Sequence, residues 1–129
     1  VVAEGKGTLI LDERDLWPER RFSTAVVIVR RAFLDAHPEI VAAFLDAHRA
    51  AVAAIRKDPD AARKVIGEQI ARHSAGKALP DPVLRDALSR TEITDDPLKE
   101  SVLTFADRAR ELGYLRADRD TLKELFATP

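Results

Sequence analysis

The first thirty residues contain two short apolar segments with the pattern of β-strands. One is residues 8–11 and the other is residues 23–29, where positions 25–29 are apolar on both faces and mostly β-branched. A strand of this kind is normally buried from both sides and needs neighbouring strands. The best further strand in the sequence is residues 90–94. We therefore expect either a small sheet or a sheet whose other strands belong to a part of the protein outside this sequence.

From residue 31 onward the pattern becomes helical, and four X-Pro steps mark where helices begin. These steps are His37-Pro38, Asp58-Pro59, Asp81-Pro82 and Asp96-Pro97. Proline suits the first turn of a helix because its missing N–H would have no partner there, and a preceding aspartate can cap the free amides. With apolar residues spaced near 3.6, the pattern predicts helices at about 38–57, 59–74, 82–90, 97–112 and 119–127, and a short helical turn at 32–36.

Apolar stripes predict which face of each helix is buried. The stripes consist of Ile40, Val41, Phe44, Leu45, Val52 and Ile55 in the first long helix, Val65, Ile66 and Ile70 in the second, and Val102, Phe105, Ala109 and Leu112 in the fourth. Gly76 and Gly113 follow two of these helices, where a left-handed C-terminal cap favours glycine. The predicted fold is mainly α with a small β element: residues 1–30 supply the strands and their loop, and residues 31–129 form a helical region.

Composition and charge narrow the class of protein. The 129 residues are 46% hydrophobic and 33% charged, which is typical of one soluble domain. The net charge of −1 gives no overall basic field for nucleic acid, and we expect no nucleic-acid partner. The longest apolar run, residues 25–29, is far shorter than the ~18 residues that a membrane-spanning segment needs. We expect no membrane span in this chain.

Several residue types are absent altogether. The chain has no Cys, which removes disulfides, thiolate zinc sites and iron–sulfur clusters. It also has no Met, and residues 1–5 show none of the features of a signal peptide. We therefore expect a processed or excised segment of a longer protein.

The histidines and glycines suggest no cofactor. His37, His48 and His73 are too far apart in sequence to bring two imidazoles to one metal ion from a single helix. The five glycines form no phosphate-binding loop. We predict neither a metal nor a cofactor.

The loop between the two predicted strands holds the most suggestive polar residues. Asp12, Glu13 and Asp15 could bind a cation, or they could form a solvated turn beside Arg14. Trp17 could cover an alkyl chain while its indole N–H donates a hydrogen bond, or it could fill the edge of the helical core. The residues alone leave both pairs of alternatives open.

Five stretches of the chain together resemble a known family. They are Gly-Thr-Leu-Ile-Leu-Asp-Glu-Arg-Asp-Leu-Trp-Pro at 7–18, Phe-Ser-Thr-Ala-Val-Val-Ile-Val-Arg-Arg-Ala-Phe-Leu-Asp-Ala-His-Pro-Glu-Ile-Val at 22–41, Gly-Lys-Ala-Leu-Pro at 76–80, Arg-Thr-Glu-Ile-Thr-Asp-Asp-Pro-Leu at 90–98 and Ala-Arg-Glu-Leu-Gly-Tyr-Leu at 109–115. In this order they resemble the C-terminal portion of substrate-binding proteins of ABC importers, in the aliphatic-sulfonate, nitrate and taurine group. The resemblance implies a C-terminal fragment of a type II periplasmic-binding-protein-like α/β fold, in which two lobes close on a ligand. Residues 22–30 would be the crossover strand that returns to the first lobe, and its neighbours would come from an N-terminal half that this sequence lacks.

The same resemblance implies a function in transport without catalysis. The parent protein would capture a small anionic solute, an aliphatic sulfonate, outside the cytoplasmic membrane, in the periplasm or anchored by lipid at the cell surface, and deliver it to an ABC permease. Candidate ligand contacts are Arg14, Trp17, Ser23 and Thr24. Arg14 could pair with the sulfonate through parallel N–H donors, the two hydroxyls could donate hydrogen bonds, and the indole could cover the carbon chain.

Two other functions stay open. Enzymes that make the thiamine pyrimidine precursor have a similar fold, but they use a histidine and often a Cys-rich segment, and this chain has no Cys and no clustered His. The other alternative is a helical module that serves only protein contacts.

Overall fold

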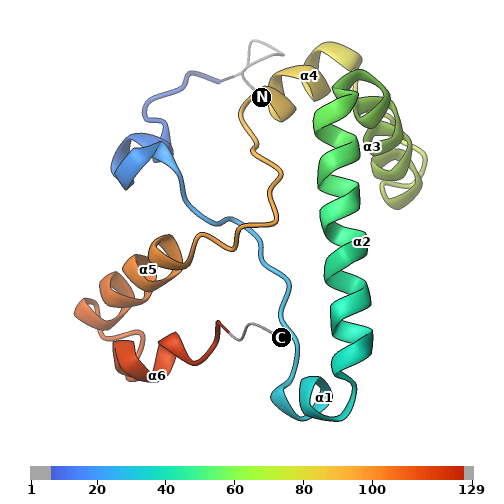
Figure 1. Ribbon diagram of the computed structural model, residues 1–129. Coiled ribbons are helices and arrows are strands. Elements are labelled where there is room, and N and C mark those ends of the chain that lie inside the picture. Colours follow the sequence, from blue (N-terminus) through green and yellow to red (C-terminus); the bar gives the residue numbers. More distant parts are fainter. Residues whose placement is uncertain (1–6, 127–129) are drawn as a thin grey trace. The chain divides into compact units, whose positions relative to one another are not determined.

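The computed structural model describes residues 7–126, and every regular element in this range is a helix (Figure 1). The α-helices are α1 (Arg31–Ala36), α2 (Pro38–Lys57), α3 (Pro59–His73), α4 (Asp81–Ser89), α5 (Lys99–Glu111) and α6 (Arg119–Lys123). Two short 3₁₀ helices, η1 (Glu13–Leu16) and η2 (Pro18–Arg20), precede them. The predicted helices are therefore present. The last one is shorter than predicted: it ends at Lys123, and residues 124–126 are not helical. The predicted end, residue 127, lies outside the described residues.

The small β element that the sequence predicts is not seen between residues 7 and 126. Residues 8–11, 23–29 and 90–94 are all irregular. Over residues 25–29, no backbone hydrogen bond reaches another described residue. A strand exists only as part of a hydrogen-bonded ladder, so an apolar β-branched sequence without a neighbour remains irregular.

Two of the four X-Pro steps locate the helix start to the residue, and of these only the step before α3 has the expected aspartate cap. α4 begins at Asp81 itself, after Pro80, with no side-chain cap. α2 and α3 begin at Pro38 and Pro59, and the Asp58 side chain accepts a hydrogen bond of 2.9 Å from the N–H of Ala61. Before α5 the prediction is wrong by two residues. There Asp96 accepts from the N–H of Leu98, whose left-handed backbone (φ 50°, ψ 57°) delays the helix.

Contacts group the described residues into two units. The outer unit contains residues 7–41 and 96–126, and the middle unit contains residues 42–95. The predicted division at residue 30 concerned the topology of a larger fold and stays a prediction.

The core of the outer unit lies on one face of α5. Leu103 is 1% exposed and Ala106 is also buried, whereas Phe105 is 64% exposed and Leu112 is 72% exposed. The predicted stripe is therefore wrong for these last two residues. In this unit α5 packs on α6, and it contacts the loop that carries Trp17 through Phe105 and Arg108.

The core of the middle unit is small. Val52 of α2 and Leu84 of α4 are buried, but Phe44, which the predicted stripe places inside, is 48% exposed. α3 and α4 approach closely at Gly67, where an added Cβ would lie 2.9 Å from Leu84 Cδ2. Gly67 therefore permits the contact between these two helices.

The predicted glycine cap is confirmed after α5, where Gly113 directly follows the cap residue Leu112. After α3 the first left-handed residue is Ala75 (φ 52°), and Gly76 comes next. Gly76 and Gly113 have φ of 79° and 78°, and they follow α3 and α5. The N–H of Gly76 donates to the carbonyl of Ala71 at 2.9 Å, and that of Tyr114 donates to the carbonyl of Ala109 at 2.8 Å. Both hydrogen bonds are of the kind that ends a helix through a left-handed residue.

Candidate functional site

Arg14, the predicted anion-binding residue, is held by a carboxylate of its own loop. Its Nε donates to Asp12 Oδ1 at 3.0 Å and its Nη2 donates to Asp12 Oδ2 at 2.6 Å. Asp12 also caps η1 by accepting from the backbone N–H of Arg14 at 3.0 Å. These hydrogen bonds hold the pKa of Asp12 well below its usual range and raise the pKa of Arg14. Two of the guanidinium nitrogens are thus engaged.

Trp17 is enclosed by side chains that surround its ring. It is 7% exposed, and its ring is nearly parallel to those of Phe22 at 5.2 Å and Phe105 at 6.3 Å between centroids. The guanidinium carbon of Arg108 lies 4.4 Å from the Trp17 ring centroid. Arg108 Nη2 also donates to the carbonyl of Leu16 at 3.1 Å. The loop is therefore fastened to α5 through its indole.

Ser23 and Thr24 differ in their surroundings. The backbone N–H of Ser23 donates to Ser101 Oγ at 2.8 Å, and the Ser23 hydroxyl donates to the carbonyl of Pro97 at 2.7 Å. Thr24 is exposed. The structure thus brings Trp17 and Ser23 into contact with α5 and with the residues just before it, and leaves Thr24 on the surface. The role of all four candidates in ligand binding stays a prediction.

Arg108 is the residue in this region that sequence reasoning missed. Its contacts are with Trp17 and Leu16, which are more than ninety positions earlier in the chain. No local spacing links them. The available signal is weak: Arg108 follows Phe105 by three positions, so the two lie on the same side of α5.

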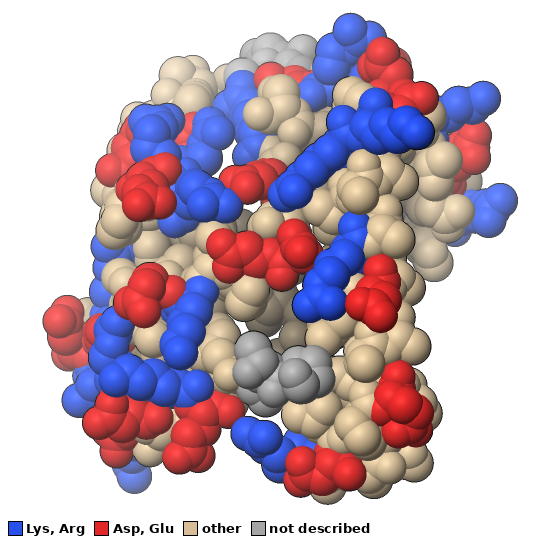
Figure 2. Space-filling view, viewed as in Figure 1, with Lys and Arg blue, Asp and Glu red and all other residues tan. Residues whose placement is uncertain are grey.

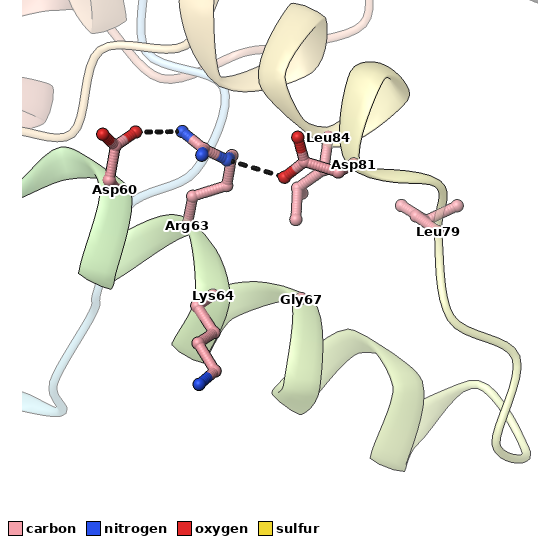
Figure 3. A pocket seen from close by; sticks show the side chains of 7 residues that line it. All are labelled: Asp60, Arg63, Lys64, Gly67, Leu79, Asp81 and Leu84. Carbon is pink, nitrogen blue, oxygen red and sulfur yellow. Dashed lines mark hydrogen bonds and ion pairs between the residues drawn. The ribbon is translucent and has the colours of Figure 1, made fainter.

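The middle unit contains a pocket of about 360 Å³ between α3 and α4 (Figure 3). It is lined by Asp60, Arg63, Lys64, Gly67, Leu79, Asp81 and Leu84. Arg63 reaches between Asp60 and Asp81, donating to their carboxylates at 2.5 and 2.9 Å. These hydrogen bonds raise the pKa of Arg63. The pKa of Asp81 is lowered, chiefly by its hydrogen bond from Arg63 and secondly by one from Arg85. The arginine in this pocket joins α3 to α4.

Charges elsewhere are mixed, and the described residues show no feature of a metal centre. Figure 2 shows Lys and Arg side chains interspersed with Asp and Glu on the visible face. Within residues 7–126, no group of three His, Asp or Glu side chains is placed to hold a metal ion. None of the helices in the described part is long and apolar enough to span a bilayer.

Comparison with known proteins gives one match. The family model described as NMT1/THI5 like matches residues 1–62, just under half of the chain. This match supports a relation to the sulfonate, nitrate and taurine-binding proteins without selecting one group among them. The family covers substrate-binding proteins of ABC importers and thiamine-synthase-like members. No curated protein and no solved structure matches the chain.

Proposed function

We propose that this chain is part of the solute-binding component of an ABC importer, and that the parent protein captures a small organic anion, an aliphatic sulfonate, outside the cytoplasmic membrane. One observation carries the proposal. Inside the family match, the chain presents an apolar strand sequence that the described residues leave uncovered. This is the segment that the family resemblance assigns to the crossover between lobes.

The exposure of this segment is large for residues of its type. Val26, Val27, Ile28 and Val29 are 51%, 71%, 87% and 47% exposed. Burying a side chain of this size contributes roughly 1.5–3 kcal/mol when it is complete, so these four leave several kcal/mol unrealised. A segment that is apolar on both faces gains this free energy inside a sheet, between two neighbouring strands and under cover on both sides.

The small core supports the same conclusion. The buried apolar residues of the described range are Trp17, Val52, Leu84, Leu103 and Ala106, and of these only Leu103 is fully buried. A chain that is 46% hydrophobic ordinarily buries many more. We therefore assign the missing cover to an N-terminal half with sheet strands, as the two-lobed fold would provide.

The proposed ligand class follows from the family and from the chemistry of the loop. Arginine and hydroxyl donors suit a sulfonate, and uptake requires capture and release without making or breaking a bond. Arg14 would meet the ligand with the N–H donors that Asp12 does not engage. Delivery would then require contact with an ABC permease.

A second candidate is a thiamine-pyrimidine-synthase-like enzyme, because the matching family model includes such members. That activity depends on a histidine in the family. Within the matched residues, the chain has His37 at the α1–α2 junction and His48 on α2, where its ring stacks on Phe44 with 6.2 Å between centroids. Neither lies in the loop that carries the candidate contacts, so we favour transport.

Calorimetry on two proteins tests the proposal. The intact parent protein should bind 1-butanesulfonate tightly, whereas the 129-residue chain should bind it weakly or not at all, because enclosure supplies most of the buried surface of a small ligand. Butanol is the matched uncharged control. Tight binding by the chain alone would show that the pocket is complete here. If the intact protein binds no sulfonate, sulfate ester or nitrate, the ligand class is wrong.

A further inference from the structure

We infer that Arg108 and Phe105 form a binding surface for a small alkyl anion, with the head group on the Arg108 guanidinium and the chain on the Phe105 ring. The inference takes its ligand class, an alkyl sulfonate, from the proposed function. It differs from the sequence-based candidates in the residues that contact the ligand. These residues lie on α5, and Trp17 packs against both of them without contacting the ligand itself.

Arg108 is oriented before any ligand arrives. Its guanidinium carbon lies 4.4 Å from the Trp17 ring centroid, which is cation–π distance, and its Nη2 donates to the Leu16 carbonyl at 3.1 Å. Two contacts on a long side chain remove rotamer freedom that binding would otherwise have to remove. The guanidinium is therefore better prepared for an anion than an ordinary surface arginine.

Arg108 also has no carboxylate within ion-pair distance among the described residues. Two arginines of the loop itself differ from Arg108: Arg14 is paired with Asp12 and Arg20 with Asp15. A guanidinium has five N–H donors, and the Leu16 carbonyl takes only one from Arg108. A charge-assisted, two-point contact with a sulfonate or carboxylate is thus available at Arg108, whereas Asp12 competes for it at Arg14.

Phe105 supplies the apolar half of the surface. Its ring is 64% exposed, and it packs 6.3 Å from the same Trp17 indole on which Arg108 lies. Residues three apart on a helix are neighbours, so the ring and the guanidinium are adjacent. Trp17, at 7% exposure, has little surface left to cover an alkyl chain. The combination of a fixed cation and an adjacent bare ring fits an anion with a short carbon chain.

The test uses the 129-residue chain and follows Trp17, its single tryptophan. The indole N–H resonance of Trp17 is recorded by NMR while 1-butanesulfonate, inorganic sulfate or butanol is added. We expect weak but saturable shifts with butanesulfonate, of far lower affinity than in the intact parent protein, still weaker binding of sulfate and no response to butanol. Arg108→Gln should weaken butanesulfonate at least about tenfold, the loss expected for a charge-assisted hydrogen bond.

Matched variants separate this site from a general charge effect. Arg110→Gln removes the same charge from the same helix, where Arg110 pairs with Asp107 at 3.7 Å, and should leave binding unchanged. Phe105→Ala should weaken butanesulfonate without changing sulfate. Arg108→Lys keeps the charge but loses the parallel N–H donors, so its affinity for butanesulfonate should lie between those of wild type and Arg108→Gln. If Arg108→Gln does not fold, Arg108→Lys tests the site in its place.

Three results would overturn the inference: equal affinity of wild type and Arg108→Gln, equal losses in Arg108→Gln and Arg110→Gln, or no response of Trp17 to any anion. None of them decides the proposed function, because that function is tested by sulfonate binding to the intact parent protein. If the intact protein fails to bind sulfonates while this chain binds them through Arg108, the surface stands and the transport assignment does not.

Discussion

Leu103 and Phe105 are two positions apart on α5 and give a direct test of which face of this helix is buried. Leu103 is 1% exposed and Phe105 is 64% exposed. Leu103→Ala removes three buried carbons, at about 0.8 kcal/mol each, and leaves a cavity that adds to the loss. The expected decrease in unfolding free energy is about 2.5–4 kcal/mol.

Phe105→Ala removes a larger side chain but a smaller buried area. About two-thirds of the ring is already in water, so the transfer contribution is roughly 1 kcal/mol. Its contact with Trp17 adds about 0.5 kcal/mol. We expect a total of roughly 1–1.5 kcal/mol, well below that for Leu103→Ala although phenylalanine is the larger residue.

Urea denaturation followed by circular dichroism at 222 nm and by Trp17 fluorescence measures both changes. Leu103→Met, which nearly conserves volume, is the control and should cost less than about 1.5 kcal/mol. If Phe105→Ala lost as much stability as Leu103→Ala, α5 would bury the face that the apolar spacing predicted, and the packing described for the outer unit would be wrong.

Three further variants test local features. Asp58→Ala should lower stability by about 1 kcal/mol in urea denaturation because α3 loses its cap, whereas Asp58→Asn should retain most of it; equal values would remove Asp58 as a cap. Gly113→Ala should cost about 1 kcal/mol because φ is 78° while the space around it is open, and an unchanged midpoint would contradict the left-handed cap. Hydrogen bonds from Arg63, the larger cause, and from Arg85 lower the pKa of Asp81 in the folded state. Ionised Asp81 therefore stabilises the fold fully above the ordinary aspartate pKa near 3.9, and this stabilisation is lost as pH falls through the lower folded-state pKa. Asp81→Asn should flatten the dependence of stability on pH below about pH 4, and an unaltered dependence would show that this ion pair does not stabilise the fold.

Much of the helical structure could be predicted because its signals are local. The Asp58 cap, Pro59 in the first turn of α3, and the glycines after α3 and α5 act within a few residues of where they stand. Such signals need no information about distant parts of the chain. Before α5 the same type of signal failed by two residues, because Asp96 formed a turn with Leu98 in place of a helix cap.

Burial could be predicted less well because it depends on partners. The apolar spacing placed Phe44 and Phe105 inside, yet Phe44 is about half exposed and Phe105 about two-thirds exposed. The strand sequence at residues 25–29 likewise has the composition of a sheet centre without a neighbour in the described chain. A periodic pattern identifies an apolar face, but only the packed neighbours decide whether that face is covered.

The candidate site shows the same division between local and distant interactions. Asp12 and Arg14 are two positions apart and satisfy one another, so the solvated-turn interpretation describes this pair, and the loop's own sequence already contained that possibility. Arg108 reaches the loop only because α5 packs beside it. Arg14 is compensated by Asp12, which is close to it in sequence. Arg108 reaches the loop from α5 and has no carboxylate partner among the described residues. At this loop, the guanidinium best placed to bind an anion is therefore that of Arg108, which is too far away in sequence to be linked to the loop by local spacing.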